Sequence, residues 1–209
     1  MSGLTPIILA AGASSRMGRP KALLDFDGRT ALQLCLEAVR GHGTPIVVLG
    51  SNHAEIRSRL ALGHVRVMLN LNVDSGQTAS LQAGLSILPR DAEGFFFLPV
   101  DVPLVTAADV ARLVDAFEAE PDPAKSIFIP SHDLKRGHPI LCRRELASEF
   151  VALGEGASAR EVVNRVNSRI AYVIYPEAYV LMDMDTPEDY VRCLEAYRAR
   201  GKNSEKGGR

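Results

Sequence analysis

The chain has 209 residues, of which 46% are hydrophobic, and its 24 Lys and Arg nearly balance 25 Asp and Glu. This length suits one α/β domain with a substantial core and is short for two. A net charge of -1 gives no global basic field for nucleic acid or an anionic membrane. No apolar run approaches the ~20 residues of a membrane span. Three scattered cysteines without a C-x-x-C pair, and no signal-like N-terminus, predict a cytoplasmic protein.

Strand and helix patterns alternate along the first half of the chain. Apolar runs predict buried strands, and amphipathic stretches predict helices. The predicted strands are 4–10, 45–49, 65–69 and 95–98, and the predicted helices are 30–40, 53–62, 78–88 and 106–118, the last with Thr106 as N-cap. This alternation predicts a mostly parallel sheet with helices on both faces, a Rossmann-like three-layer α/β/α fold.

The second half of the chain is less regular. Strands are predicted at 126–130, 140–142 and 170–175, and helices at 143–153, 157–166 and 187–199. We expect one domain over residues 1–200 and a disordered polar tail at 201–209. Because ligands bind at the carboxyl ends of the strands in such a sheet, loops 12–21, 70–78 and 99–103 are expected to face one site.

The loop after the first strand has features that suit a polyphosphate. Small residues from Gly12 onward leave backbone N–H groups accessible, and Arg16 and Lys21 supply positive charge. The loop is not a Walker loop, because Gly12 and Gly18 are one residue too far apart. It also fails the G-x-G-x-x-G dinucleotide pattern, because residue 14 is Ser. The alternative interpretation is an ordinary strand–turn–helix junction with stray charges.

Two further segments place carboxylates where a divalent cation could bind. Asp101 follows the buried strand at 95–98, and Mg²⁺ prefers carboxylate oxygens together with substrate phosphates. Asp183 and Asp185 alternate with methionines, so an extended backbone would direct both to one side. The alternatives are structural. Asp101 could form a turn or an N-cap, and Asp185 or Thr186 could cap the last helix.

Two polar segments complete the candidate site. Residues 70–81 (N-L-N-V-D-S-G-Q-T-A-S-L) lead into a predicted helix, whose free N–H groups and dipole suit ribose or phosphate oxygens. A plain helix start is the alternative. Arg136-Gly137-His138-Pro139 places His138 between Gly and Pro, where its ring could face an acceptor, although a lone His is more often structural.

The first loop, L-A-A-G-x-S-x-R-M-G-x-P-K, resembles that of the molybdenum cofactor nucleotidyltransferases. The resemblance runs to Tyr190 through N-x(5)-G-x(3)-S-L from Asn70, D-x-P at Asp101, G-H-P at 137–139 and D-x-D-T-P-E-D from Asp183. It implies a fold of the nucleotide-diphospho-sugar transferase type. It also implies Mg²⁺-dependent transfer of a nucleoside monophosphate from an NTP to a phosphate-bearing acceptor, with release of pyrophosphate.

The same resemblance assigns roles to individual residues. The implied catalytic residues are Arg16, Lys21 and Asp101. The implied Mg²⁺ ligands are Asp101 and Asp185, with Asp183 as the fallback for the second. The implied nucleotide-binding residues are Leu9, Ala10, Ala11, Gly12, Lys21, Asn70, Gly76 and Ser80. Gln77 and His138 are expected to bind the acceptor.

Residues 9–12, Leu-Ala-Ala-Gly, resemble the cytidylyl members, whereas the guanylyl members have L-A-G-G. The methyl group of Ala11 narrows the space beside the base, so we expect CTP rather than GTP. We expect molybdopterin as acceptor, with a client molybdoenzyme as a further candidate partner. Gln77 departs from the Met common in cytidylyl members.

Three other functions compete with this prediction. The same fold could act on a sugar, polyol or isoprenoid-precursor phosphate. A non-catalytic nucleotide-binding or cofactor-delivery protein would not require the carboxylates Asp101 and Asp185. A dinucleotide-dependent reductase is disfavoured by the failed G-x-G-x-x-G pattern.

Overall fold

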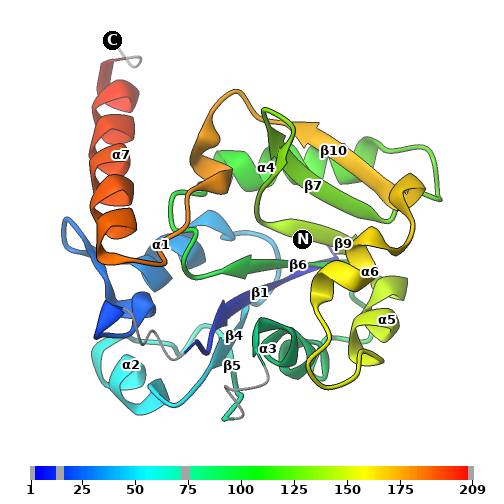
Figure 1. The fold of residues 1–209 in the computed structure, drawn as a ribbon, viewed down its shortest axis with the longest axis horizontal. Coiled ribbons are helices and arrows are strands. Elements are labelled where there is room, and N and C mark those ends of the chain that lie inside the picture. Colours follow the sequence, from blue (N-terminus) through cyan, green and yellow to red (C-terminus); the bar gives the residue numbers. More distant parts are fainter. Residues whose placement is uncertain (1–2, 13–16, 72–75, 207–209) are drawn as a thin grey trace.

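The fold is organised around one mixed sheet (Figure 1), in a computed structural model that describes residues 3–12, 17–71 and 76–206. Its eight strands follow the order β10-β7-β9-β6-β1-β4-β5, with β8 paired to β7 beside β9. The strands are β1 (Leu4–Ala10), β4 (Ile46–Leu49), β5 (Arg66–Leu69), β6 (Gly94–Pro99), β7 (Ile127–His132), β8 (Lys135–Arg136), β9 (Ile140–Arg143) and β10 (Ile170–Ile174). A separate hairpin pairs β2 (Asp25–Phe26) with β3 (Arg29–Thr30).

The helices connect these strands and cover the sheet. They are α1 (Ala31–Ala38), α2 (His53–Arg59), α3 (Gly76–Leu85), α4 (Ala107–Ala119), α5 (Ala147–Val151), α6 (Ala159–Arg165) and α7 (Pro187–Lys206). Short 3₁₀ helices lie at Lys21–Leu23, Arg144–Leu146, Asn167–Arg169 and Ala178–Leu181. Among the described residues, no helix is long and apolar enough to span a membrane.

The strands are apolar on both sides because helices cover both faces of the sheet. Along β1, Ile8 packs into one hydrophobic cluster with residues of α1, α2 and α4, whereas Ile7 packs into a second with residues of α3, α5 and α6. Phe96 and Phe97 on β6 divide between the same two clusters. Each such buried side chain contributes roughly 1.5–3 kcal/mol of hydrophobic free energy. The predicted three-layer α/β/α architecture is confirmed.

The sheet is mostly parallel, as predicted, with two antiparallel strands, β8 and β9. β1 pairs with β4 and β6 in parallel, and β10 pairs with β7 in parallel. β9 runs antiparallel to both β6 and β7. The reversal follows a tight turn in which Asp133 and Leu134 adopt φ values of 47° and 63°. Two consecutive left-handed residues suit a two-residue hairpin, but Asp-Leu is not a usual sequence for it, so the sequence did not predict β8.

Helix α3 lies unusually close to the sheet because of a glycine. A Cβ on Gly84 would lie 2.6 Å from Ile7 Cγ2 and 3.2 Å from Val48 Cγ2. The absence of a side chain lets α3 pack directly on β1 and β4. This contact fixes the helix start, which carries Gly76 and Gln77, beside the carboxyl end of β1.

Two helices differ from the prediction more than the others do. Residues 143–153 form a 3₁₀ turn and the short helix α5 rather than one long helix. The last helix, predicted to end at residue 199, continues to Lys206, into the segment expected to be a tail. Arg200 helps explain the extension, because its guanidinium donates to the Leu104 carbonyl oxygen at 2.7 Å and pairs with Asp109 at 3.0 Å. These contacts hold the helix against the body beyond its predicted end.

Candidate active site

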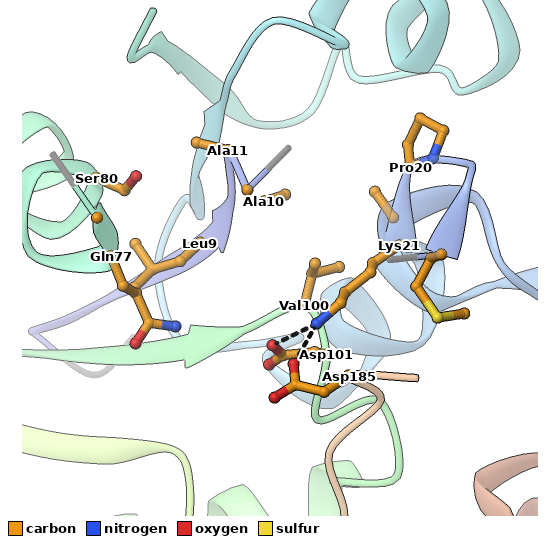
Figure 2. Close-up of a pocket in the computed structure, with 14 residues that line it drawn as sticks. Leu9, Ala10, Ala11, Pro20, Lys21, Gln77, Ser80, Val100, Asp101 and Asp185 are labelled. Carbon is orange, nitrogen blue, oxygen red and sulfur yellow. Dashed lines mark hydrogen bonds and ion pairs between the residues drawn. The ribbon is translucent and has the colours of Figure 1, made fainter. Parts of the chain in front are cut away.

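A cavity of about 300 Å³ lies at the carboxyl end of β1 (Figure 2). It is lined by segments that are far apart in the sequence, as expected for this edge of the sheet. The predicted site residues that line it are Leu9, Ala10, Ala11, Gly12, Lys21, Gly76, Gln77, Ser80, Asp101 and Asp185. Sequence reasoning gave no role to four other lining residues, Met17, Pro20, Ala22 and Val100. Arg16 lies outside the described residues.

The most distinctive feature of the cavity is a lysine held between two carboxylates. Lys21 Nζ lies 3.2 Å from Asp101 Oδ2 and 2.6 Å from Asp185 Oδ1. Burial by itself lowers the pKa of Lys21, but the hydrogen bonds and charges of Asp185 and Asp101 outweigh it and raise that pKa. The ammonium is therefore charged at neutral pH. Figure 2 shows Lys21 reaching both carboxylates, with Gln77 and Ser80 on the opposite side of the cavity.

Asp101 is held at the cavity by the backbone around it. It follows β6, where the Val100 N–H donates to the Leu9 carbonyl oxygen at 3.0 Å and ties this turn to β1. Burial raises the pKa of Asp101, while the positive charge of Lys21 acts in the opposite direction. The carboxylate is thus a partly desolvated group whose charge depends on a nearby cation.

The segment containing Asp183 and Asp185 is joined to the Asp101 turn by backbone hydrogen bonding. The Met184 N–H donates to the Asp101 carbonyl oxygen at 2.9 Å. The Met184 side chain is fully buried, while Asp183 and Asp185 are exposed, as the predicted alternation requires. Of the two, Asp185 lines the cavity and reaches Lys21.

Helix capping does not account for Asp185. The Asp189 N–H donates to Thr186 Oγ1 at 3.2 Å, and the Thr186 N–H donates to Asp189 Oδ2 at 2.8 Å. Thr186 therefore caps α7 and leaves the Asp185 carboxylate directed at Lys21. Thr106 and Asp109 form an equivalent capping box at α4, as predicted for Thr106.

The start of α3 supplies the opposite wall of the cavity. Gly76, Gln77 and Ser80 line it, whereas Asn70 is not among the lining residues. The Asn70 side-chain amide donates to Ser80 Oγ at 3.1 Å, and both residues are buried. Asn70 thus braces Ser80 behind the wall. Its contact with the nucleotide stays a prediction.

His138 is not among the residues that line the cavity and lies near the start of α6. Its ring packs edge-on against Phe97, with centroids 6.3 Å apart. Nearby, the Ala159 N–H donates to Thr78 Oγ1 at 3.0 Å, which joins the start of α6 to the start of α3. Burial and the positive charge of Arg160 lower the pKa of His138 to about 4, so the ring is neutral at pH 7. Sequence reasoning missed Arg160, which carries no motif.

The low pKa of His138 predicts a pH-dependent stability. An unfolded histidine titrates near pH ~6.5, so acid protonates the unfolded chain before the folded one. The free energy of unfolding therefore falls as the pH drops from ~6.5 toward the folded pKa of about 4, by about 3 kcal/mol. Urea unfolding across this range, compared between wild type and His138→Gln, isolates the effect. Parallel pH profiles for the two proteins would contradict it.

The cavity also depends on a close backbone contact beside Ala11. A Cβ on Gly50 would lie 2.1 Å from the Ala11 carbonyl oxygen. Gly50→Ala is therefore expected to displace the end of β1, lower stability by about 1–3 kcal/mol and weaken nucleotide binding. Urea unfolding and nucleotide titration measure both effects. Gly63→Ala is the matched control, because nothing lies within 4 Å of its Cβ position, and equal behaviour of the two variants would refute the expectation.

The donor set fits a divalent cation of the magnesium type. The Asp101 and Asp185 carboxylates converge on one positive charge, the Lys21 ammonium. Among the described residues, no group of three or more His, Cys, Asp and Glu could hold a metal ion. Mg²⁺ commonly binds through one or two carboxylates and completes its shell with substrate phosphates and water. The residues present therefore suit a cation that is shared with a nucleotide.

Comparison with known proteins identifies the family. The description "MobA-like NTP transferase domain" matches residues 6–170. The nicotine blue oxidoreductase of Paenarthrobacter nicotinovorans is 30% identical over 199 residues, covering 91% of this chain and 96% of its own. The molybdenum cofactor cytidylyltransferase of Escherichia coli K12 is 25% identical over 199 residues, covering 94% and 98%.

A solved structure agrees with this match over almost the whole chain. Rv0371c of Mycobacterium tuberculosis H37Rv has a TM-score of 0.81 at 28% identity, covering 93% of this chain and 98% of its own. The same protein has also been solved in complex with manganese, with a TM-score of 0.74 to this chain. The chain therefore belongs to the MobA-like NTP transferase family of nucleotidyltransferases.

Proposed function

We propose that the protein is a Mg²⁺-dependent cytidylyltransferase that moves CMP from CTP to the phosphate of molybdopterin and releases pyrophosphate. The observation that carries this proposal is the convergence of Lys21, Asp101 and Asp185 in the cavity at the carboxyl end of β1. A site that only bound a nucleotide would need the Lys21 ammonium for the phosphates, but it would not need two carboxylates beside that ammonium. The carboxylates suit the metal that accompanies a triphosphate.

In the proposed reaction, a phosphate oxygen of the acceptor attacks the α-phosphorus of CTP, and pyrophosphate leaves. Mg²⁺ held by Asp101 and Asp185 would neutralise charge on the phosphates. Lys21 would move onto the phosphates and neutralise charge there, together with Arg16. Because a phosphate monoester is already anionic, the site needs little proton transfer. Positioning and charge neutralisation by these side chains account for most of the catalysis.

The preference for CTP rests on the end of β1. Ala11 is buried, and its carbonyl oxygen lies against the backbone of Gly50, so the chain leaves little room there. A pyrimidine needs less space than a purine. The sequence Leu-Ala-Ala-Gly at residues 9–12, which resembles that of the cytidylyl members, supports the same choice.

The acceptor is proposed to bind at the α3 wall of the cavity, next to the start of α6, which a hydrogen bond from the Ala159 N–H to Thr78 Oγ1 joins to α3. Gln77 lines the cavity and is exposed, while Arg160 is exposed on α6 and acts electrostatically on His138. Arg160 provides a cation for an anionic acceptor, and neutral His138 can only contribute a hydrogen bond. Arg160→Gln is expected to raise the KM for the acceptor more than it raises the KM for CTP.

One assay tests the proposal directly. The protein is incubated with CTP or GTP, Mg²⁺ and molybdopterin, pyrophosphate is measured, and the nucleotide product is identified by mass. Molybdopterin cytosine dinucleotide formed from CTP supports the proposal. Turnover only with a sugar, polyol or isoprenoid-precursor phosphate would assign a different acceptor, and nucleotide binding without pyrophosphate would favour a cofactor-delivery protein.

Because one relative is named nicotine blue oxidoreductase, a second assay tests for oxidoreductase activity. The identity of that relative to this chain is 30%, so NADH and NADPH oxidation in the presence of nicotine blue should be measured in the same preparation. We expect none above background, because the first loop lacks the G-x-G-x-x-G pattern. Dye-dependent oxidation without pyrophosphate release would reject the transferase proposal.

The proposed setting is the cytoplasm, with a molybdoenzyme as recipient of the product. All three cysteines, Cys35, Cys142 and Cys193, are buried free thiols, as suits a reducing compartment. Co-purification of the protein with a molybdoenzyme from the cytosolic fraction would support both the proposed compartment and the proposed recipient.

A further inference from the structure

Lys21 already forms ion pairs with both proposed metal ligands in the free protein. Lys21 Nζ contacts Asp185 Oδ1 at 2.6 Å and Asp101 Oδ2 at 3.2 Å. These are carboxylate oxygens that a divalent cation would use. The Lys21 side chain is only 16% exposed, so the ammonium lies within the site and not in the solvent beside it. A cation arriving alone would meet this positive charge at the position it must take.

We propose that Lys21 excludes free divalent cations from Asp101 and Asp185 until a nucleoside triphosphate draws the ammonium away. The inference rests on the proposed function, because it assumes that these carboxylates receive the metal. Its consequence is an order of binding: the metal enters with the nucleotide, and the free protein holds little of it. Lys21 thus has a second role besides binding phosphate.

The chemistry of the three groups allows this exchange. A lysine carries a compact charge on a flexible four-carbon stem, so its ammonium can move while the backbone stays in place. Asp185 is 52% exposed at its side chain, so one end of the lysine bridge opens toward solvent and an incoming ligand. A triphosphate is more highly charged than the carboxylate pair, and under the proposed function it would bind in the same cavity. It therefore competes for Lys21 as no single small anion would.

The exchange is tested by metal binding, without an activity readout. The probe is Mn²⁺, whose free form is quantified by electron paramagnetic resonance. We expect weak Mn²⁺ binding to the wild-type protein, and binding at least about tenfold tighter when a non-hydrolysable CTP analogue is present. Nucleotide-free Lys21→Met is expected to bind Mn²⁺ about tenfold more tightly than wild type, because the carboxylates lose their cation.

Four further variants separate this effect from others. Lys21→Arg keeps the positive charge and is expected to bind Mn²⁺ as weakly as wild type. Lys21→Gln removes the charge but keeps a polar side chain, is expected to gain Mn²⁺ affinity, and covers the case in which Lys21→Met does not fold. Lys21→Met combined with Asp101→Asn is expected to lose the tight site. Lys135→Met removes an exposed lysine outside the cavity and is expected to leave Mn²⁺ affinity unchanged.

Equal Mn²⁺ affinity of folded Lys21→Met and wild type would overturn the proposal, as would nucleotide-free wild type that binds Mn²⁺ as tightly as the complex with the CTP analogue. Pyrophosphate release by the wild type is measured separately. Turnover with equal Mn²⁺ affinities removes only the exclusion by Lys21. A gain of affinity in Lys21→Met without any turnover upholds the exclusion and rejects the transferase.

Discussion

Replacement of Asp101 by Asn lowers the turnover number of pyrophosphate release by roughly 10²–10³-fold, the range found when one charged or hydrogen-bonding group that stabilises a transition state is removed. Asn keeps the shape of the side chain but removes the negative charge that faces Lys21 at 3.2 Å. The phosphates then lose part of the proposed metal site at the moment when charge develops on the leaving group. Steady-state kinetics with saturating CTP and acceptor measure the loss.

The control for this variant is Asp115→Asn, which makes the same chemical change at an exposed position on α4, outside the residues that line the cavity. It is expected to keep full turnover. Circular dichroism and thermal unfolding show whether Asp101→Asn has folded. Near-normal turnover of a folded Asp101→Asn protein would contradict the proposed role of Asp101.

Truncation of Phe96 to Ala lowers the free energy of unfolding by about 3–5 kcal/mol, as expected for removal of a fully buried aromatic ring. The Phe96 side chain is 0% exposed and packs in the cluster between β6 and the helices α1 and α4. Its ring also contacts His42 edge-on, with centroids 6.0 Å apart. The total free energy of unfolding of a domain of this kind is about 5–15 kcal/mol, so the variant loses a large share of its stability. Urea unfolding followed by circular dichroism measures the change.

Leu134→Ala is the matched control, because Leu134 is 98% exposed at the tip of the β7–β8 hairpin. It is expected to change stability by less than about 0.5 kcal/mol. If both truncations lowered stability equally, the assignment of Phe96 to the core between the sheet and its helices would be wrong.

The order of strands and helices was predictable because each element has a local cause. The run Phe95, Phe96, Phe97 and Leu98 is apolar at every position, which requires cover on both faces of a strand, and the sheet has such cover. Thr106 was predictable as an N-cap because its hydroxyl needs only Asp109, three residues away. The loop from Gly12 to Lys21 was recognisable from its spacing, although Arg16 lies outside the described residues.

Other features depend on contacts that no local pattern encodes. β9 is antiparallel because a two-residue turn at Asp133 and Leu134 sends the chain back. Helix α7 continues past its predicted end because Arg200 contacts Leu104 and Asp109, which lie near the middle of the chain. Asn70 faces Ser80, not the cavity, because both are buried behind the start of α3.

The alternating α/β architecture, the small-residue loop after the first strand and the three acidic candidates were recognisable from the sequence, because each depends on residues within a few positions of one another. The resemblance already favoured Asp185 over Asp183, but the contact of Asp185 with the Lys21 that also meets Asp101 is visible only in the folded chain. The Met184 N–H is tied to the Asp101 carbonyl oxygen, and Thr186 takes over the capping of α7. The lysine between the two carboxylates arises because residues far apart in the chain meet at the carboxyl edge of one sheet, and no spacing in the sequence records that meeting.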